Sequence, residues 1–366
     1  MKISILLPDL RGGGVERVGI VLAHEFARSG HEVEFVVMQA RGELLDEARA
    51  SYHVVDLATP RFRAVPLALA RYLRHRRPDA LLAAMWPLTG IAGVANRLSG
   101  QKTRLTASEH TDFRRTPSHK GYERWLLKWF GRQLYAPCDA VVAVSHGVAG
   151  SLREVAGLRS ERVTVIHNPV RPMAAEEMKV DDRQLLRHWL QGEVRLIAVG
   201  SLKAQKGFDV LLRSLARLRA CVDARLLILG EGGLRSELTE LAMELGIAEH
   251  VVLPGFRANP SVFLKHASVF VLSSHWEGFG NVIVEALTAG VPVVSTDCPS
   301  GPSEILDGGK YGRLVPPGDW RSMAAEIMSV LHDPPNSEDL KMRGAEFSPN
   351  LMAARYLDLL SGSHRA

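Results

Sequence analysis

The stretch VFVLSSHWEGFGNVIVEALTAGVPVVST, residues 269–296, holds a strand, a turn, a helix and a second strand in direct succession. The apolar run at 269–272 predicts the first strand, and two glycines, Gly278 and Gly280, predict the turn. The helical pattern that follows ends at Gly290, a residue that often terminates helices, just before the run VPVVS. This order is typical of a parallel sheet whose strands are joined by helices.

The same alternation of short β-branched runs and amphipathic segments extends over the whole chain. It predicts an α/β protein whose parallel sheets carry helices on both faces. Helical patterns include residues 15–28 and 122–134. Strands are expected in two series, at residues 3–7, 32–38, 53–57, 80–84, 104–108, 140–144 and 163–167, and then at 195–199, 226–229, 251–253, 269–272 and 291–295.

Two series of strands predict two doubly wound domains. The 366 residues exceed what one hydrophobic core usually sustains. The segment HNPVRPMAAEEMKVDD, residues 167–182, lacks strand character and has two prolines, which favours a linker. We therefore predict a first domain at 1–170, a linker at 171–190 and a second domain at 191–346. Because ligands of doubly wound sheets gather at the carboxyl ends of the strands, an interdomain cleft is the expected site.

Composition excludes several classes of protein. Cys138, Cys221 and Cys298 lie far apart without a CxxC motif, so neither a disulfide framework nor a zinc site is indicated, and a reducing compartment, the cytoplasm, is expected. The uncharged run at 80–96 is too short to span a membrane and contains Pro87. The N-terminal MKISILLPDL reads as a first strand and not as a signal peptide.

Positive charge is concentrated in one part of the chain. The net charge is +5, but residues 61–132 hold 15 Lys and Arg against four acids. Such a region attracts phosphates of nucleic acid or of anionic lipid. Within it, FRRTPSHKGYERWLLKWFGRQL, residues 113–134, combines six Arg or Lys with Trp125, Trp129 and Phe130 at helical spacing. Two interpretations remain open: a helix with its aromatic side chains in the core, or a surface that rests on anionic lipid.

Two glutamates flank the turn of the opening stretch. Glycines 278 and 280 let the backbone approach a ligand closely, and a helix that begins near Asn281 would direct its free N–H groups at a phosphate. Glu277 and Glu285 can then accept hydrogen bonds from hydroxyls on either side, as the hydroxyls, diphosphate and ribose of a nucleotide sugar require. The alternative interpretation is a capped helix with solvated glutamates.

Three other stretches add candidate groups. VGSLKAQKGFDVLLRSL, residues 199–215, carries Lys203 and Lys206 on a loop after a strand, where a lysine can neutralise a diphosphate or simply face solvent. HVVLPGFRANP, residues 250–260, has a turn at Gly255. VSTDCPSGPSEILDGGKYGRLVPPGD, residues 294–319, is expected to be a rigid, turn-rich loop.

In this order the motifs resemble those of the retaining glycosyltransferases of family 4, which have the two-domain GT-B fold. The motifs are GSL…KGF, LGEG, PGF and SSHWEGFGNVIVEALTAGVPVVSTDCPSGPSEIL, and the resemblance is dense over residues 199–317. In the first half it rests on GGGVER (12–17), SEH (108–110), AVS (143–145) and IHNPV (166–170). FSPNLMAARYLDLL (347–360) is similar to the last helix of the family, so residues 347–366 are expected to cross back onto the first domain.

The resemblance implies roles for the second-domain residues. Glu285 would hold the ribose hydroxyls, and Glu277 would bind the transferred sugar close to the reacting centre. Lys206 would offset charge on the departing diphosphate, an electrostatic contribution expected to be a large part of catalysis. Arg257 lies where the family seats its nucleotide base. The sugar and diphosphate would be lined by Gly278, Phe279, Gly280, Asn281 and Val282.

The resemblance also implies roles for residues of the first domain, and the sequence departs from the family pattern at one position in the second. Gly12, Gly13 and Gly14 would form the loop that faces the donor phosphates, and His110 lies near a family histidine that contacts the sugar. Taken alone, His110 could instead be a structural histidine with its hydrogen bonds satisfied. The neighbouring Glu109 and Asp112 are expected only to orient it. Ser201 stands after Gly200, where the family commonly has arginine. Either Lys203 supplies the second positive charge, or Lys206 and backbone amides hold the diphosphate alone.

The expected function is retaining transfer of a hexose or N-acetylhexosamine from a nucleotide diphosphate sugar, a UDP-sugar, to a hydroxyl of a lipid-linked surface glycan. The family uses no essential metal, and no other cofactor is expected. Since such acceptors are lipid-linked, we favour peripheral contact of the basic aromatic segment with anionic lipid at the inner face of the cytoplasmic membrane. No nucleic-acid-binding motif accompanies the charge.

Two alternative functions remain open, and two others are disfavoured by the motifs. A nucleotide-sugar epimerase and a non-catalytic partner subunit, both with the GT-B fold, stay open as alternatives. A dehydrogenase is disfavoured because Arg17 replaces the third glycine of a G-x-G-x-x-G fingerprint. No G-x4-G-K-[ST] motif is present, so a P-loop ATPase is also disfavoured.

Overall fold

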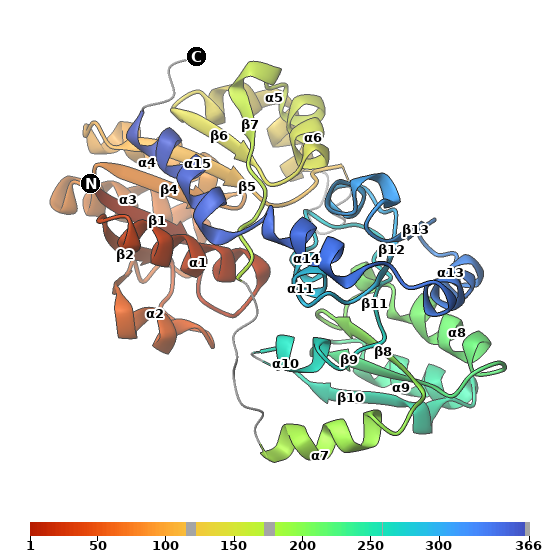
Figure 1. Ribbon diagram of the computed structural model, residues 1–366. Helices are drawn as coiled ribbons and strands as arrows, with labels where there is room; N and C mark the ends of the chain where they lie inside the picture. Colours follow the sequence, from red (N-terminus) through yellow and green to blue (C-terminus); the bar gives the residue numbers. More distant parts are fainter. Residues whose placement is uncertain (115–121, 172–179, 258, 363–366) are drawn as a thin grey trace. The chain divides into compact units, whose positions relative to one another are not determined.

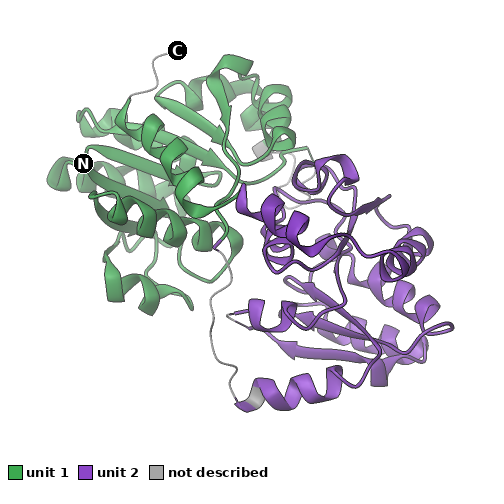
Figure 2. Ribbon diagram, viewed as in Figure 1, with its two compact units in different colours: residues 1–170, 347–366 green, residues 171–346 purple. Residues whose placement is uncertain are grey.

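The computed structural model describes residues 1–114, 122–171, 180–257 and 259–362 (Figure 1). The chain divides into two compact units, which are residues 1–170 with 347–366 (unit 1) and residues 171–346 (unit 2) (Figure 2). Each unit holds one fully parallel sheet connected by helices. The predicted α/β class, with two Rossmann-like doubly wound domains, is therefore confirmed.

Unit 1 is built on a seven-stranded sheet in the order β3-β2-β1-β4-β5-β6-β7. Its strands are β1 (Lys2–Leu7), β2 (Glu32–Val37), β3 (His53–Asp56), β4 (Ala80–Ala84), β5 (Arg104–Glu109), β6 (Ala140–Ala143) and β7 (Val163–Val165). Its helices are α1 (Gly14–Arg28), α2 (Leu45–Ser51), η1 (Phe62–Ala64), α3 (Val65–Arg76), α4 (Leu88–Ser99), α5 (Tyr122–Tyr135), α6 (His146–Ala156), η2 (Ser160–Arg162) and α15 (Pro349–Ser361).

Unit 2 is built on a six-stranded sheet in the order β10-β9-β8-β11-β12-β13. Its strands are β8 (Val194–Val199), β9 (Ala224–Leu229), β10 (Val251–Gly255), β11 (Val269–Leu272), β12 (Val293–Thr296) and β13 (Arg313–Val315). Its helices are α7 (Val180–Trp189), η3 (Ala204–Lys206), α8 (Phe208–Leu218), α9 (Arg235–Glu244), η4 (Ala248–His250), α10 (Ser261–Leu264), α11 (Asn281–Thr288), α12 (Pro302–Ile305), η5 (Asp307–Gly309), α13 (Trp320–His332) and α14 (Ser337–Ala345).

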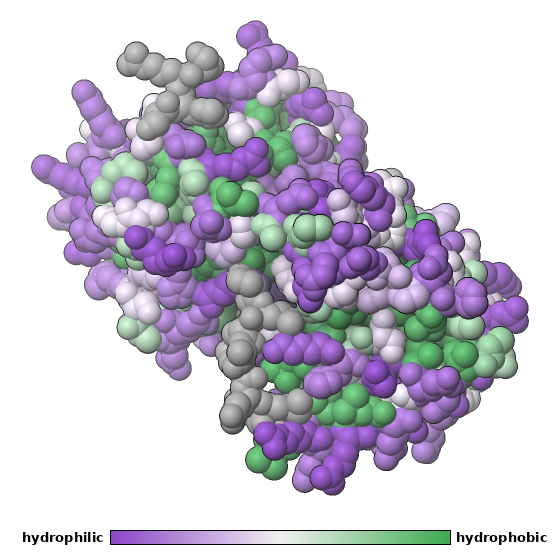
Figure 3. All heavy atoms as spheres, viewed as in Figure 1, coloured by the Kyte–Doolittle hydropathy of each residue, from purple (hydrophilic) through white to green (hydrophobic). Residues whose placement is uncertain are grey.

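The central strands are buried because their sequences are apolar on both faces. β1, KISILL, is buried at every residue after its first, and β4, ALLAA, is buried throughout. Continuous apolar runs of this kind are the signature of strands covered on both sides. On the face drawn in Figure 3, hydrophilic side chains cover most of the surface, and apolar ones emerge in small groups between them.

The C-terminal helix α15 belongs to the core of unit 1. Pro349 occupies its first position, where proline needs no N–H partner. Met352, Tyr356 and Leu360 lie in the same apolar cluster as the residues of β1 and α1. The Arg104 guanidinium of β5 also donates to the Leu359 carbonyl, at 2.6 Å. Residues 363–366, the end of the segment expected to return, lie outside the described residues.

The prediction of a linker at residues 171–190 is wrong for the second half of that range. Residues 172–179 lie outside the described residues, but Val180–Trp189 forms helix α7 of unit 2. Leu186 and Trp189 lie three positions apart and are both buried, and the Trp189 indole donates to the Leu196 carbonyl at 3.2 Å. This apolar pair is a helical signal that the polar composition of the segment hides.

The turn-rich loop expected at residues 294–319 is also wrong in part. It contains α12 and the edge strand β13, which pairs with β12 through Ser295 and Leu314. Only three residues of β13 lie between glycine and proline neighbours, too few for a pattern to show. The twelve expected strands all form within one or two residues of their predicted bounds, and β13 is the additional strand.

The uncharged run at 80–96 forms a strand and a helix, as expected. It divides into β4 and the first part of α4. Among the described residues, no helix combines the length and the apolar character needed to cross a bilayer.

Candidate functional site

In unit 2 two predicted site residues, Lys206 and Glu277, lie on loops that follow the carboxyl ends of the strands. Lys206 closes η3, after β8, and Glu277 lies on the turn after β11, the neighbouring strand. The Lys206 ammonium lies 2.6 Å from Glu277 Oε1, and the Ser274 hydroxyl donates to the same oxygen at 2.6 Å. Both partners are largely buried, with 19% and 8% of their side chains exposed. The structure thus joins two predicted site residues, and it adds Ser274, which the sequence analysis missed.

Hydrogen bonds from side chains to the backbone hold these two loops together. The Ser273 hydroxyl donates to the Lys206 carbonyl at 2.8 Å, and the side-chain amide of Gln205 donates to the Trp276 carbonyl at 2.9 Å. Gly207 has φ of 57°, and a Cβ there would lie 2.3 Å from the Ser273 carbonyl oxygen. Only glycine fits this position, because it needs both a left-handed backbone and a close approach. The Lys206–Glu277 pair is therefore held by the backbone as well as by charge.

The turn at 278–280 leads directly into helix α11. Gly280, with φ of 105°, precedes Asn281, the first residue of the helix. Phe279 is buried, and a Cβ on Gly301 would lie 1.8 Å from its carbonyl oxygen, so the loop after β12 packs against the turn. Helix α11 thus begins at the turn where the predicted phosphate would bind, and a helix N-terminus favours an anion.

Further along α11, Asn281 and Val282 are half-buried. Glu285 is the fifth residue of the helix and is also half-buried. The two glutamates of the turn thus lie on either side of the start of α11, in the order that the sequence predicts.

A buried thiol lies near the charged pair. Burial, with the Glu277 carboxylate beside it, raises the pKa of Cys298 to about 12. The thiol is therefore protonated at neutral pH, the form in which cysteine is a poor nucleophile.

Gly200, Ser201 and Lys203 lie on the loop that leads from β8 to η3. A Cβ on Gly200 would lie 3.0 Å from Lys206 Cε, so glycine gives the lysine stem room to cross the loop. Ser201 and Lys203 are both exposed. The loop thus presents Lys203 to solvent while Lys206 is held against Glu277.

Arg257 is fixed within unit 2. Its Nε donates to Asp182 Oδ1 of α7 at 2.9 Å, and its Nη1 donates to the carbonyls of Pro254 and Phe256 at 2.9 and 3.0 Å. The corrected helix α7 therefore supplies the carboxylate that holds Arg257. The Phe256 ring beside it is 36% exposed.

In unit 1 the triple-glycine loop forms the start of helix α1. Gly12 has φ of 85°, Gly13 is the N-cap and Gly14 is the first helical residue. The Glu16 carboxylate folds back over this end, since a Cβ on Gly13 would lie 2.5 Å from its Oε2. Burial raises the pKa of Glu16, partly offset by a hydrogen bond from the backbone.

His110 follows β5 and is held by Ser108. Its Nε2 lies 3.1 Å from the Ser108 hydroxyl, which lies 2.9 Å from the Tyr356 hydroxyl of α15. Burial lowers the pKa of His110 to about 4, so the imidazole is neutral at physiological pH. Asp112 pairs instead with the Arg114 guanidinium, at 2.6 Å, and does not orient the imidazole as expected.

Glu109 does not orient His110 either. It is completely buried and accepts hydrogen bonds from Thr89 Oγ1 and the Tyr135 hydroxyl, each at 2.5 Å, and from the Trp86 amide at 3.1 Å. Burial raises its pKa to about 7 against these three donors. Glu109 thus ties β5 to the turn after β4, to α4 and to the end of α5.

Helix α5 excludes one of the two interpretations of the basic aromatic segment, the one that places its aromatic side chains in the core. Residues 115–121 of the segment lie outside the described residues. Trp125, Trp129 and Phe130 are 49%, 64% and 45% exposed, so the aromatic side chains are not in the core. Leu127 and Tyr135 of the same helix are buried. The amphipathic helix therefore packs through a narrow apolar face and presents its larger aromatic side chains outward.

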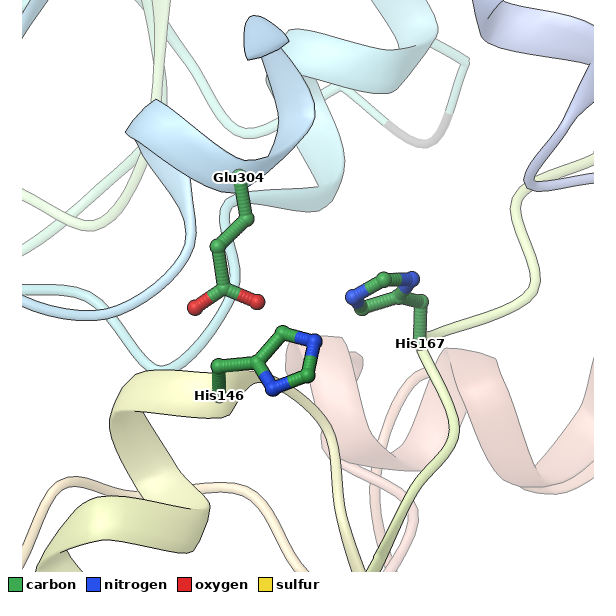
Figure 4. A group of neighbouring side chains, drawn as sticks. All are labelled: His146, His167 and Glu304. Atoms are coloured by element: carbon green, nitrogen blue, oxygen red, sulfur yellow. The ribbon is translucent and has the colours of Figure 1, made fainter. Parts of the chain in front are cut away.

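Two histidines that were not singled out lie close together in unit 1. His146 begins α6 and His167 follows β7, with ring centroids 6.3 Å apart. Figure 4 shows both rings. His167 also contacts the Phe347 ring, at 5.4 Å, just before α15.

Two parallel-sheet domains of this kind define the GT-B class of glycosyltransferase folds. The Anabaena protein Alr3699/HepE, solved in complex with UDP and glucose, has the same fold with a TM-score of 0.81 and 20% identity, over 99% of this chain and all of that one. The lipopolysaccharide outer core galactosyltransferase WaaB, in its apo form, gives a TM-score of 0.75 over both full chains, at 21% identity.

Family models identify both units. Residues 12–173 match the model "Glycosyltransferase Family 4" and residues 188–347 match "Glycosyl transferases group 1". The chain therefore belongs to the family 4 glycosyltransferases and is a glycosyltransferase of glycan or lipopolysaccharide biosynthesis.

Relatives of known name agree. A Campylobacter jejuni N-acetylgalactosamine-N,N'-diacetylbacillosaminyl-diphospho-undecaprenol 4-alpha-N-acetylgalactosaminyltransferase is 28% identical over 91% of this chain and 90% of its own. The Rhizobium meliloti lipopolysaccharide core biosynthesis glycosyltransferase LpsE is 28% identical over 96% of both chains.

Proposed function

We propose that this enzyme transfers a hexose or N-acetylhexosamine from a UDP-sugar to a hydroxyl of a lipid-linked glycan acceptor, with retention at the anomeric carbon and without a metal. The observation that carries the proposal is the Lys206–Glu277 pair at the start of α11. It sets a cation, a carboxylate and the N-terminus of a helix close together, as a sugar diphosphate requires.

Each group has a chemical task in this proposal. Glu277 accepts hydrogen bonds from hydroxyls of the transferred sugar, and Glu285 accepts from the ribose. Lys206 and the amides of the turn stabilise the charge that develops on the diphosphate as it leaves. The bond between the anomeric carbon and the phosphate oxygen breaks, the acceptor oxygen bonds the same face of that carbon, and its proton passes to the departing phosphate oxygen. No separate base is then needed.

The relatives support the donor and the acceptor. The Anabaena protein was solved with UDP and glucose, and the name of the Campylobacter jejuni enzyme specifies a diphospho-undecaprenol acceptor. A lipid-linked acceptor places the reaction at a membrane surface. We therefore infer peripheral association with the inner face of the cytoplasmic membrane.

Helix α5 supports this association. Besides its exposed aromatic side chains it carries Arg124 and Lys128, which are also exposed. A cavity of about 340 Å³ at its end adds more positive charge. It is lined by Arg132, Tyr135, Ala136, Gly157, Leu158, Arg159 and Arg162. Aromatic rings among cations match the interface of an anionic bilayer.

Vesicle binding tests the role of α5. We expect the protein to float with vesicles that contain phosphatidylglycerol at low salt, and the variant Trp125→Ser/Trp129→Ser/Phe130→Ser to bind roughly 10- to 100-fold more weakly, because partial burial of three large apolar side chains is lost. Met243→Ser, which removes a side chain 62% exposed in unit 2, is the matched control and should bind normally. Equal binding by all three proteins would remove α5 from the interface.

Donor turnover tests the activity itself. The purified protein is incubated with UDP-, GDP- and ADP-sugars, with and without a polyprenyl-diphosphate-linked glycan, and free nucleotide is measured. We expect release of UDP only when the acceptor is present, and an α-linked product from an α-linked donor by NMR. Conversion of a UDP-sugar without acceptor would indicate the epimerase instead, and no turnover on any pair would indicate a non-catalytic subunit.

A further inference from the structure

Three side chains of unit 1 form one hydrogen-bonded chain that reaches from the C-terminal helix to the predicted sugar-binding histidine. The Tyr356 hydroxyl of α15 lies 2.9 Å from Ser108 Oγ of β5, and Ser108 Oγ lies 3.1 Å from His110 Nε2. Tyr356 and Ser108 are 0% and 1% exposed. The two outer residues are 246 positions apart in sequence.

The direction in which these hydrogen bonds are donated follows from Tyr356, at the end of the series farthest from His110. Within the part of the protein that the structure describes, the Tyr356 hydroxyl has no hydrogen-bond partner other than Ser108. A buried O–H without an acceptor loses its hydrogen bond to water and gains nothing in return, so Tyr356 donates to Ser108. Ser108 then directs its own proton to His110 Nε2, which must accept it and therefore carries no hydrogen.

The other ring nitrogen is consequently protonated. His110 Nδ1 is buried and has no hydrogen-bond partner among the described residues. Because burial lowers the pKa of His110 to about 4, the ring is neutral and one nitrogen alone carries a proton. The hydrogen bond at one nitrogen thus decides the state of the other.

We propose that Tyr356 is a positioning residue that, through Ser108, holds His110 as the Nδ1–H tautomer, so that the imidazole offers a hydrogen-bond donor and not a base to the bound sugar. An oxygen of the sugar would satisfy the buried N–H, which the free protein leaves without a partner in its described residues. The part that concerns the sugar rests on the proposed glycosyl transfer, and the tautomer itself does not.

Through Tyr356, helix α15 would also have a chemical role. Helix α15 packs in the core of unit 1, where its burial alone accounts for its position. Tyr356 is the residue through which it touches Ser108, so the seating of this helix sets the proton position on His110. Packing of a distant segment is in this way coupled to the chemistry of the site.

NMR of protein with ¹⁵N-labelled histidine tests the tautomer without any substrate. The His110 signals are identified by their loss in His110→Gln. We expect the wild type to carry its proton on Nδ1, and both Tyr356→Phe and Ser108→Ala to shift it toward Nε2. A wild-type ring protonated on Nε2, or the same tautomer in all three proteins, would overturn the proposed hydrogen-bond relay from Tyr356 through Ser108 to His110.

Steady-state kinetics test whether the His110 tautomer affects the rate of sugar transfer. We expect Tyr356→Phe to lower kcat/KM for the donor roughly 10-fold, as the loss of other orienting hydrogen bonds does. Tyr356→Phe/Ser108→Ala should be no slower than Ser108→Ala alone, since both act on one path. If the tautomer shifts but no donor turns over in the wild type, the relay stands and the proposed function fails.

Tyr72→Phe is the matched control. Tyr72 is likewise buried and its hydroxyl bonds a strand serine, Ser4, at 2.6 Å, together with Glu34. Ser4 and Glu34 are the third residues of β1 and β2, in the halves of these strands away from their carboxyl ends. The control should lose stability like Tyr356→Phe but keep the His110 tautomer and the rate. If it lowers the rate as much, loss of packing and not the relay explains the effect.

Discussion

Lys206→Ala is expected to lower kcat by about 100-fold or more while the donor KM changes far less. The ammonium is the buried cation of the Lys206–Glu277 pair and is held in place by the hydrogen bonds between their loops. A preorganised charge of this kind acts mainly on the diphosphate as it gains charge in the transition state, and removal of one such group costs about 10²- to 10³-fold in kcat. Single-turnover and steady-state rates with a UDP-sugar measure the effect.

Loss of the lysine also leaves Glu277 without its cation, which can destabilise unit 2. Lys206→Met retains the stem that crosses Gly200, and Lys206→Met/Glu277→Gln removes both charges. Both should fold and both should be slow, which separates catalysis from stability. Lys203→Ala, on the same loop but exposed, should be at least tenfold more active than Lys206→Ala. Equal losses at the two lysines would mean that Lys203 shares the diphosphate, and normal turnover in Lys206→Met would exclude the assigned role.

Glu285→Ala should weaken UDP binding about 10- to 100-fold, with kcat at saturating donor nearly unchanged. A hydrogen bond to a charged group is worth about 1.5–3 kcal/mol, which corresponds to this range of affinity. The half-buried carboxylate in the second turn of α11 would make such bonds to the ribose hydroxyls, which take no part in bond breaking. Titration calorimetry with UDP alone measures the loss.

Deoxy nucleotides identify the partner of Glu285. Wild-type protein should bind 2′-deoxy- or 3′-deoxy-UDP more weakly than UDP, whereas Glu285→Ala should bind the deoxy form of the contacted hydroxyl and UDP alike. Glu237→Ala, which removes an exposed glutamate from the first turn of α9, is the control and should bind normally. If the variant still discriminates both deoxy forms as strongly as wild type, the ribose is held elsewhere.

Predictions from the sequence were most accurate where the signal is local. Twelve strands were found from β-branched runs between turn residues, because a buried parallel strand must be apolar on both faces. The two elements that the sequence analysis missed, β13 and α7, have local signals that are too weak to detect. β13 has three residues, and helix α7 has two buried apolar side chains in a polar segment.

The candidate site was predicted as a set of residue types, without their partners. The order of Glu277, the glycine turn and Glu285 can be read from one stretch, since the turn and the helix that follow are set by neighbouring residues. Nothing local indicates that Glu277 would bind Lys206, 71 positions away, or that Ser274 would join them. Nor did the neighbours of His110 orient it, since Glu109 and Asp112 bond elsewhere.

The sequence by itself determined the class of fold and the identity of the charged groups, because periodicity and turn chemistry act between residues a few positions apart. Tertiary structure alone decided which of these groups meet. It set Lys206 against Glu277, linked Tyr356 to His110 and turned the aromatic side chains of α5 outward. Such contacts depend on how whole strands and helices pack, and packing brings together residues whose separation along the chain carries no local signal.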